Sequence, residues 1–307
     1  MNLAPYCGDR GAEHWADDRR PHSRRTYASD VSGSKTYLFN ASGFRGEDLD
    51  AAAALRVFVC GASYAFGTGL DWEETWGYRM KAKLGLRLGI EASGVNLLNF
   101  SQSLASANYI TRTLLAQCDA VRPDLVVAVF SDMKRGEYFA GGAPVGVLPR
   151  RYPWFRRWLV LRPGWARRLR RLLPGPGDRR AASTRLKMWN HYAHLYSAEG
   201  AFVNTLSNVL LLQSFCRARG IDCLISWVQR RHLQDPRFLG NPVIAPLMQL
   251  IDHDRFCSFS IVDADVCVDT AADGIHPGTA SNEAFAERLV ESYMRIRNAP
   301  ANGMSSP

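Results

Sequence analysis

Short runs of apolar, β-branched and aromatic residues alternate with longer stretches of helical pattern between about residues 55 and 297. Continuous apolar runs of this kind are typical of strands buried on both faces of a parallel sheet. Parallel neighbours need crossover connections, which are right-handed and usually helical. The pattern predicts an α/β fold, a three-layer α/β/α sandwich with a five-stranded parallel sheet that is doubly wound and flavodoxin-like. The expected strands are 55–60, 96–100, 125–130, 221–228 and 259–266, and the expected helices are 73–88, 106–121, 201–219, 242–253 and 281–297.

The length of 307 residues allows one or two domains. Residues 1–34 are polar and are predicted to be a flexible or loosely packed leader. One domain is expected over residues 35–300, with a basic insertion at about residues 140–190. Hydrophobic residues make up 47% of the chain and charged residues 22%, which excludes a largely disordered, collagen-like or coiled-coil protein.

No apolar run approaches the roughly 18 residues of a membrane span, so we expect no transmembrane segment. The N-terminal residues are polar where a signal peptide needs an apolar stretch, which predicts a cytoplasmic location. Seven cysteines without metal-like spacing predict reduced, mostly buried thiols. His191 and His194 lie three residues apart but have no third ligand in view, so we expect no metal and no cofactor.

A glycine-rich turn, GASYAFGTG over residues 61–69, follows the first predicted strand. Its glycines permit tight turns and positive φ angles around Ser63. A serine here can point its Oγ into the crevice beyond the sheet, where doubly wound folds place their sites. The same turn could instead cradle a phosphate.

A second motif, DGIHPG over residues 273–278, precedes the last predicted helix. A serine becomes a good nucleophile when a base removes its proton, and histidine suits that role near neutral pH. The base needs an acceptor that fixes its tautomer, which Asp273 could supply to His276. The alternative is that these residues form an Asx turn followed by His-Pro and have no catalytic role.

Together the two motifs resemble those of the SGNH (GDSL-type) hydrolase superfamily over about residues 36–297. The segment NASGFRG at residues 40–46 looks like the stretch that precedes the catalytic domain in many bacterial members, and the LDWEETW stretch at 70–76 looks like the one that follows the first block. The resemblance implies the SGNH hydrolase fold. It also implies that Ser63 is the nucleophile, His276 the general base and acid, and Asp273 its orienter, in acyl transfer through an acyl-serine.

The chain departs from the family pattern in each of its first three blocks. Ala62 replaces the Asp that normally precedes the serine. Ser101 replaces the second-block glycine, although its backbone N–H could still serve the oxyanion hole together with that of Ser63. The family's third block has an Asn as an oxyanion donor, whereas the matching stretch here contains Asp132 and no Asn. Losing one oxyanion donor lowers the rate by about 10²–10³. The residues considered as oxyanion or substrate contacts there are Asp132, Lys134 and Asn108.

The insertion over residues 150–187 holds thirteen basic residues and one acidic residue, Asp178, so it carries +12 in a chain whose total is +9. Tryptophans and leucines interleave with its arginines. It could be an amphipathic lid over an acyl pocket, a docking surface for an acidic partner, or a solvated surface hairpin. No nucleic-acid motif is present, so nucleic acid is not an expected partner.

The leading functional hypothesis is an SGNH-type serine hydrolase that cleaves an acyl ester or thioester, on a small-molecule or carrier-bound acyl substrate. A biosynthetic tailoring role fits the expected location. The alternatives are an acyltransferase that passes the acyl group to a second acceptor, and a catalytically weakened SGNH-like binding protein.

Overall fold

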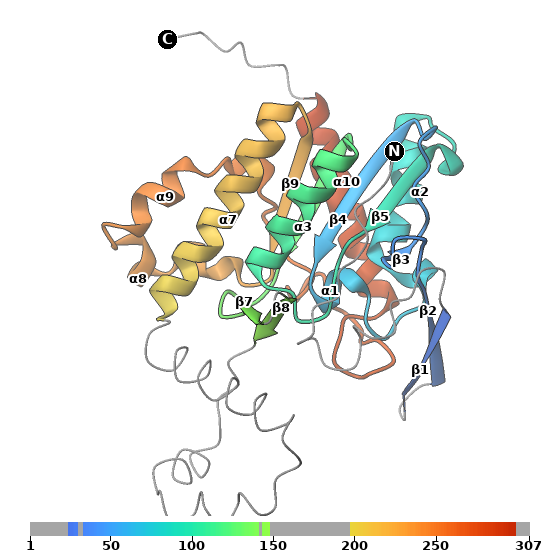
Figure 1. Ribbon diagram of the computed structural model, residues 1–307, viewed down its shortest axis with the longest axis horizontal. Helices are drawn as coiled ribbons and strands as arrows, with labels where there is room; N and C mark the ends of the chain where they lie inside the picture. The colour runs from blue at the N-terminus through green and yellow to red at the C-terminus, as the bar shows by residue number, and fades with distance from the viewer. Residues whose placement is uncertain (1–23, 30–32, 141–142, 148–196, 299–307) are drawn as a thin grey trace, which may run out of the picture.

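A computed structural model describes residues 24–29, 33–140, 143–147 and 197–298 (Figure 1). Its central sheet has five strands in the order β3-β5-β4-β6-β9. Their bounds are β3 Arg45–Gly46, β4 Leu55–Gly61, β5 Val95–Asn99, β6 Leu125–Phe130 and β9 Asp222–Trp227. Helices cover both faces of the sheet (Figure 1), so the predicted three-layer α/β/α architecture is confirmed.

The four longer strands are parallel, and their order places the first of them, β4, between β5 and β6. The two-residue edge strand β3 is antiparallel to β5, so the sheet is mostly rather than wholly parallel. Pairing of Gly61 with Val129 brings the carboxyl ends of β4 and β6 to the same edge. Whatever follows these two strands therefore meets at that edge.

Alternate residues of each strand enter two separate cores. On one side Phe58 of β4 packs in a core shared with α3 (Ala107–Ala120) and α7 (Ala198–Arg219). On the other side Val57 and Val59 pack with α2 (Trp76–Leu88) and α10 (Thr279–Asn298). Burial on both faces explains why the strands read as continuous apolar runs instead of alternating ones.

The strand predicted at 259–266 is wrong. The chain passes the edge of β9 with a single parallel bridge, between Ile225 and Phe256. It then turns, because the Asp263 carboxylate accepts the N–H of Ser260 and the side chain of Arg230. A carboxylate that satisfies a nearby N–H offers the backbone an alternative to the strand ladder. The fifth strand of the sheet is instead β3, which the sequence did not indicate.

The smaller elements connect these layers. Two antiparallel hairpins are formed by β1 (Arg24–Ser29) with β2 (Gly33–Leu38), and by β7 (Gly136–Ala140) with β8 (Ala143–Val147). The short helices are α1 (Ser63–Phe66), α8 (Pro236–Leu239) and α9 (Ile244–Leu250), and the 3₁₀ turns are η2 (Trp72–Glu74), η3 (Ala92–Gly94), η4 (Arg230–Gln234) and η5 (His253–Arg255).

The predicted boundary between leader and domain, at residues 34 and 35, falls inside strand β2. The basic insertion at 150–187, His191 and His194 all lie outside the described residues, so those predictions stay predictions. Every cysteine in the described ranges is a free thiol. No helix among the described residues is long and apolar enough to cross a membrane.

Candidate active site

Ser63 opens the four-residue helix α1, two residues after β4 ends. Gly61 is required there, because an added Cβ would lie 2.6 Å from the Ala65 Cβ and 2.8 Å from the Val129 carbonyl oxygen. The helix ends at Gly67, whose φ of 79° is left-handed. Ser63 itself is only 8% exposed. Its N–H lies in the first turn of α1 and donates to no acceptor within the described residues.

Asp273 and His276 form a hydrogen-bonded pair on the loop that precedes α10. Asp273 Oδ2 lies 2.5 Å from His276 Nδ1, and Asp273 Oδ1 accepts the N–H groups of Ile275 and His276 at 3.0 Å each. Burial is the largest influence on the Asp273 carboxyl and opposes its ionisation. The two N–H donors and the imidazole outweigh it, so the pKa of Asp273 is lowered. The pair leaves the other ring nitrogen, Nε2, for a substrate or nucleophile.

The serine turn and the histidine loop pack against each other. The N–H of Ala272 donates to the Gly69 carbonyl oxygen at 3.2 Å, and the Tyr64 and His276 ring centroids lie 5.3 Å apart. An added Cβ on Gly69 would lie 3.3 Å from the Asp273 carboxyl carbon. No hydrogen bond joins Ser63 Oγ to the His276 ring in the described part of the chain. In ligand-free enzymes catalytic hydrogen bonds are often long and tighten when substrate binds.

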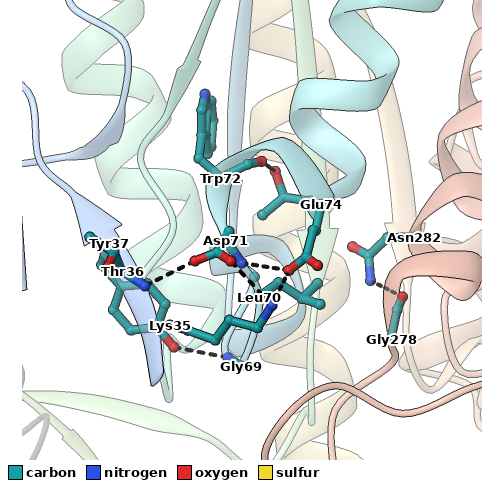
Figure 2. A network of polar contacts seen from close by, with 12 residues as sticks. Lys35, Thr36, Tyr37, Gly69, Leu70, Asp71, Trp72, Glu74, Gly278 and Asn282 are labelled. Carbon is teal, nitrogen blue, oxygen red and sulfur yellow. Dashed lines mark hydrogen bonds and ion pairs between the residues drawn. The ribbon is translucent and has the colours of Figure 1, made fainter. Parts of the chain in front are cut away.

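A buried asparagine links this loop to the serine turn from the other side. Asn282 Oδ1 accepts the N–H of Trp76, and its Nδ2 donates to the carbonyl oxygens of Pro277 and Gly278, the latter contact seen in Figure 2. The indole of Trp76 in turn donates to the Tyr64 carbonyl oxygen at 3.1 Å. Sequence reasoning missed Asn282, because its partners come from both halves of the chain.

Strand β2 braces the segment that follows the serine turn (Figure 2). The Tyr37 hydroxyl accepts the N–H of Gly69 at 2.8 Å, and Asp71 Oδ1 accepts the N–H of Thr36 at 2.9 Å. Lys35 pairs with Asp71 and Glu74 of the same segment. The backbone that carries Ser63 is thus tied to a strand that lies outside the central sheet.

The backbone N–H of Ser101, which the sequence predicted as an oxyanion donor, is already hydrogen-bonded within the protein. The N–H of Ser101 donates to Asn99 Oδ1 at 3.0 Å, while Asn99 Nδ2 donates to the Ala65 carbonyl oxygen at 2.8 Å. Asn99 therefore connects this loop to α1, a role that the sequence did not suggest. Ser101 could serve an oxyanion only after its N–H exchanges that partner.

The three contacts predicted around the third block do not converge on the serine. The Asp132 carboxylate accepts the backbone N–H of Lys134 at 2.9 Å, so it closes a local turn. Lys134 is exposed. Asn108 Oδ1 accepts an amide hydrogen of Asn204 on α7 at 2.9 Å. Ser131, one residue after β6, donates its hydroxyl to the Ala105 carbonyl oxygen.

Fold and site together define a class: a flavodoxin-like α/β/α sandwich with a serine at the turn after its first parallel strand and an Asp-His pair before its last helix. In this order of elements and motifs the chain resembles the SGNH (GDSL-type) hydrolase superfamily.

Solved structures similar to this chain include esterases. The psychrotrophic esterase EstA from Pseudoalteromonas sp. is 13% identical with a TM-score of 0.42, covering 79% of this chain and 98% of its own. TesA is 14% identical with a TM-score of 0.38, covering 78% and 99%. The acetylxylan esterase Axe2 from Geobacillus stearothermophilus is 11% identical with a TM-score of 0.37, covering 80% and 96%. No protein-family model and no curated protein matches the chain. At these identities and TM-scores, activity has to be argued from the chain's own residues.

Proposed function

We propose that the chain is a serine-dependent acyl hydrolase that cleaves an ester or thioester through an acyl-serine at Ser63. The observation that carries the proposal is the Asp273–His276 pair. In this pair His276 Nδ1 lies 2.5 Å from Asp273 Oδ2, and the His276 ring packs against Tyr64 of the serine turn. A carboxylate bound to Nδ1 holds the imidazole in the tautomer whose Nε2 accepts a proton. The lowered pKa of Asp273, which the N–H groups of Ile275 and His276 bring about despite its burial, keeps that carboxylate ionised at neutral pH.

The proposed reaction has two halves. His276 Nε2 takes the Ser63 proton as Oγ bonds to the acyl carbon, and then gives it to the leaving alcohol or thiol as the old acyl bond breaks. Water then attacks the acyl-serine, losing a proton to His276, which returns it to Ser63 Oγ as the acid departs. The free N–H of Ser63 would donate to the oxyanion in both halves.

The experiment is labelling with a fluorophosphonate probe, which bonds to an activated serine. The full chain is compared with Ser63→Ala and with Ser93→Ala, an exposed serine in η3 at the amino end of β5. We expect labelling of the native protein and of Ser93→Ala, and none of Ser63→Ala. Equal labelling of the native protein and Ser63→Ala would remove the proposal.

A weakened, SGNH-like binding protein is the second candidate. The observation in its favour is the Ser101 N–H, which is bonded to Asn99 Oδ1 and so is not available to an oxyanion. A native protein that resists the probe would favour this candidate. Where labelling succeeds, analysis of the products with an added alcohol distinguishes hydrolysis from transfer to a second acceptor.

A further inference from the structure

Arg135 lies in the segment that joins β6 to β7, at the sheet edge that also carries Ser63. Because Gly61 pairs with Val129, the chain emerges from β4 and β6 side by side. Figure 1 shows α1 and the β7–β8 hairpin at the same end of the sheet. The topology therefore brings the backbone of Arg135 to the sheet edge that carries the proposed active site.

The backbone on both sides of Arg135 is fixed. The Ser131 carbonyl oxygen accepts the indole N–H of Trp227 at 2.9 Å. Two residues after Arg135, Glu137 pairs with Arg112 of α3 at 2.6 Å, and its side chain is 4% exposed. The N–H of Arg135 itself donates to the Asp132 carbonyl oxygen at 3.0 Å. The backbone on either side of Arg135 is thus held to β9 and α3.

Two nitrogens of the Arg135 guanidinium are buried without a hydrogen-bonding partner in the described part of the chain, while the residue as a whole is half-buried. Its Nε and Nη1 atoms are inaccessible to solvent and donate to no acceptor within the described residues. No ion pair joins it to a carboxylate there, although Asp132 and Tyr64 interact with it electrostatically. Burial lowers the pKa of Arg135, while Asp132 and Tyr64 oppose that shift, and an arginine still stays charged in a protein.

Tyr64 connects Arg135 to the proposed catalytic residues. It follows Ser63 in α1, and its ring lies edge-on to His276. Burial raises the pKa of Tyr64 and Asp273 adds to that rise, while Arg135 lowers it, so the phenol has the Asp-His pair and the guanidinium as neighbours. Tyr64, which neighbours Ser63 in the chain, thus interacts electrostatically with both Arg135 and Asp273.

A guanidinium whose N–H donors are buried and unpaired lowers the stability of the fold unless a group of opposite charge compensates it. We propose that Arg135 binds an anionic group of the substrate, a carboxylate or a phosphate, and so selects acidic acyl esters over neutral ones. A planar guanidinium is suited to this role, because its N–H groups match carboxylate and phosphate oxygens. This inference rests on the proposed function for where the substrate lies, but anion binding itself needs no turnover.

The binding test uses the full chain and calorimetric titration with glutarate and with monoethyl phosphate. We expect at least one anion to bind, with affinity lowered about tenfold or more in Arg135→Gln and partly retained in Arg135→Lys. The control is Arg122→Gln, an exposed arginine at the amino end of β6 that donates a hydrogen bond to the Gly220 carbonyl oxygen; it should bind like the native protein. The anion that binds more tightly identifies the carboxylate or the phosphate as the recognised group.

A turnover test separates binding from chemistry. With mono-p-nitrophenyl succinate, Arg135→Gln should raise KM about tenfold or more, whereas with neutral p-nitrophenyl butyrate its KM and kcat should stay near native values. Native protein that binds neither anion, or an Arg135→Gln variant that binds both as the native protein does, overturns the inference. So does an equal loss of kcat on both esters, which would mark Arg135 as an oxyanion or structural residue. If no ester is cleaved, the proposed function fails while the calorimetric result still decides this one.

Discussion

Three backbone carbonyl groups at the end of the serine turn face one guanidinium. Arg45, 1% exposed, donates from Nη1 to the carbonyl oxygens of Phe66 and Gly67 at 2.5 and 2.6 Å, and from Nη2 to that of Leu70 at 2.6 Å. It also lies over the Tyr37 ring, 4.3 Å from the centroid. Ala62, at the start of α1, offers no side chain that could cap the helix, and α1 has no side-chain cap at that end. Arg45 therefore holds the turn from its opposite end.

Replacing Arg45 by lysine should destabilise the protein although the charge is kept. An ammonium group lacks the planar fork that reaches all three carbonyls, and each buried group left unsatisfied costs about 1–3 kcal/mol. We expect Arg45→Lys to lower the free energy of unfolding in urea by about 2 kcal/mol and to slow fluorophosphonate labelling of Ser63. The exposed Arg122→Lys is the control, with an expected change within about 0.5 kcal/mol. Equal effects of the two variants would contradict this role for Arg45.

Single residues also show how far sequence reasoning reaches into the site. Asp273 and His276 are neighbours in the chain, so their local motif sufficed to predict the pair that the structure contains. Arg45 stands in a recognised segment, but its partners are more than 20 residues away, so its contacts could not be read from spacing. The role proposed for Arg135 rests on two buried nitrogens without a partner among the described residues, a feature that no sequence pattern indicates.

Among the secondary-structure elements, helix α10 depends on a cap that lies outside it. Asp269 Oδ1 accepts the N–H and hydroxyl of Ser281, and Oδ2 accepts the N–H of Ala280. Burial opposes ionisation of Asp269 most strongly, but these donors and the N–H of Gly278 prevail and lower its pKa. A negative charge is favourable at a helix N-terminus. The cap fixes the start of the helix directly after the His276 loop.

The cap makes a pH-dependent contribution to stability. Because the folded-state pKa of Asp269 is below its ordinary value of 3.8, the contribution is complete above that value and is lost as the pH falls through the folded pKa. Asp269→Asn should lower the free energy of unfolding by about 1–2 kcal/mol at pH 7 and by less at pH 2. Urea unfolding at both pH values tests this. Asp265→Asn, an exposed carboxylate paired with Arg288, should have the smaller effect at pH 7, and the reverse order would disprove the cap.

The elements that the sequence predicted well are the continuous apolar strands and the longer helices. The strand 125–130 matches β6, and the helices at 106–121 and 201–219 match α3 and α7 to within a few residues. The failure at 259–266 has a local cause, since its apolar residues enclose Asp263, whose carboxylate closes a turn. Strand β3 has only two residues and pairs antiparallel to β5, too little for any periodic pattern to indicate.

For the whole molecule, the site depends on contacts between distant parts of the chain. Helices α2 and α10 pack side by side on one face of the sheet and bring the serine turn and the histidine loop together. Two neighbouring residues of α10 make this connection in different ways. Asn282 is buried and bonds to the Trp76 N–H at the start of α2, whereas Glu283, with a side chain 41% exposed, pairs with Arg79 and Lys83 of α2.

Substitutions of these two neighbouring residues should therefore differ in their effects on stability and on labelling. Asn282→Ala would leave the Trp76 N–H and the carbonyl groups of Pro277 and Gly278 without their side-chain partner, so we expect a loss of about 2–3 kcal/mol in the free energy of unfolding. Glu283→Ala removes two solvent-screened ion pairs and should cost less than about 1 kcal/mol. Fluorophosphonate labelling of Ser63 should slow in Asn282→Ala alone, because only that residue is bonded to the histidine loop. Labelling at the native rate in both variants would show that the serine turn and the histidine loop are aligned without this asparagine.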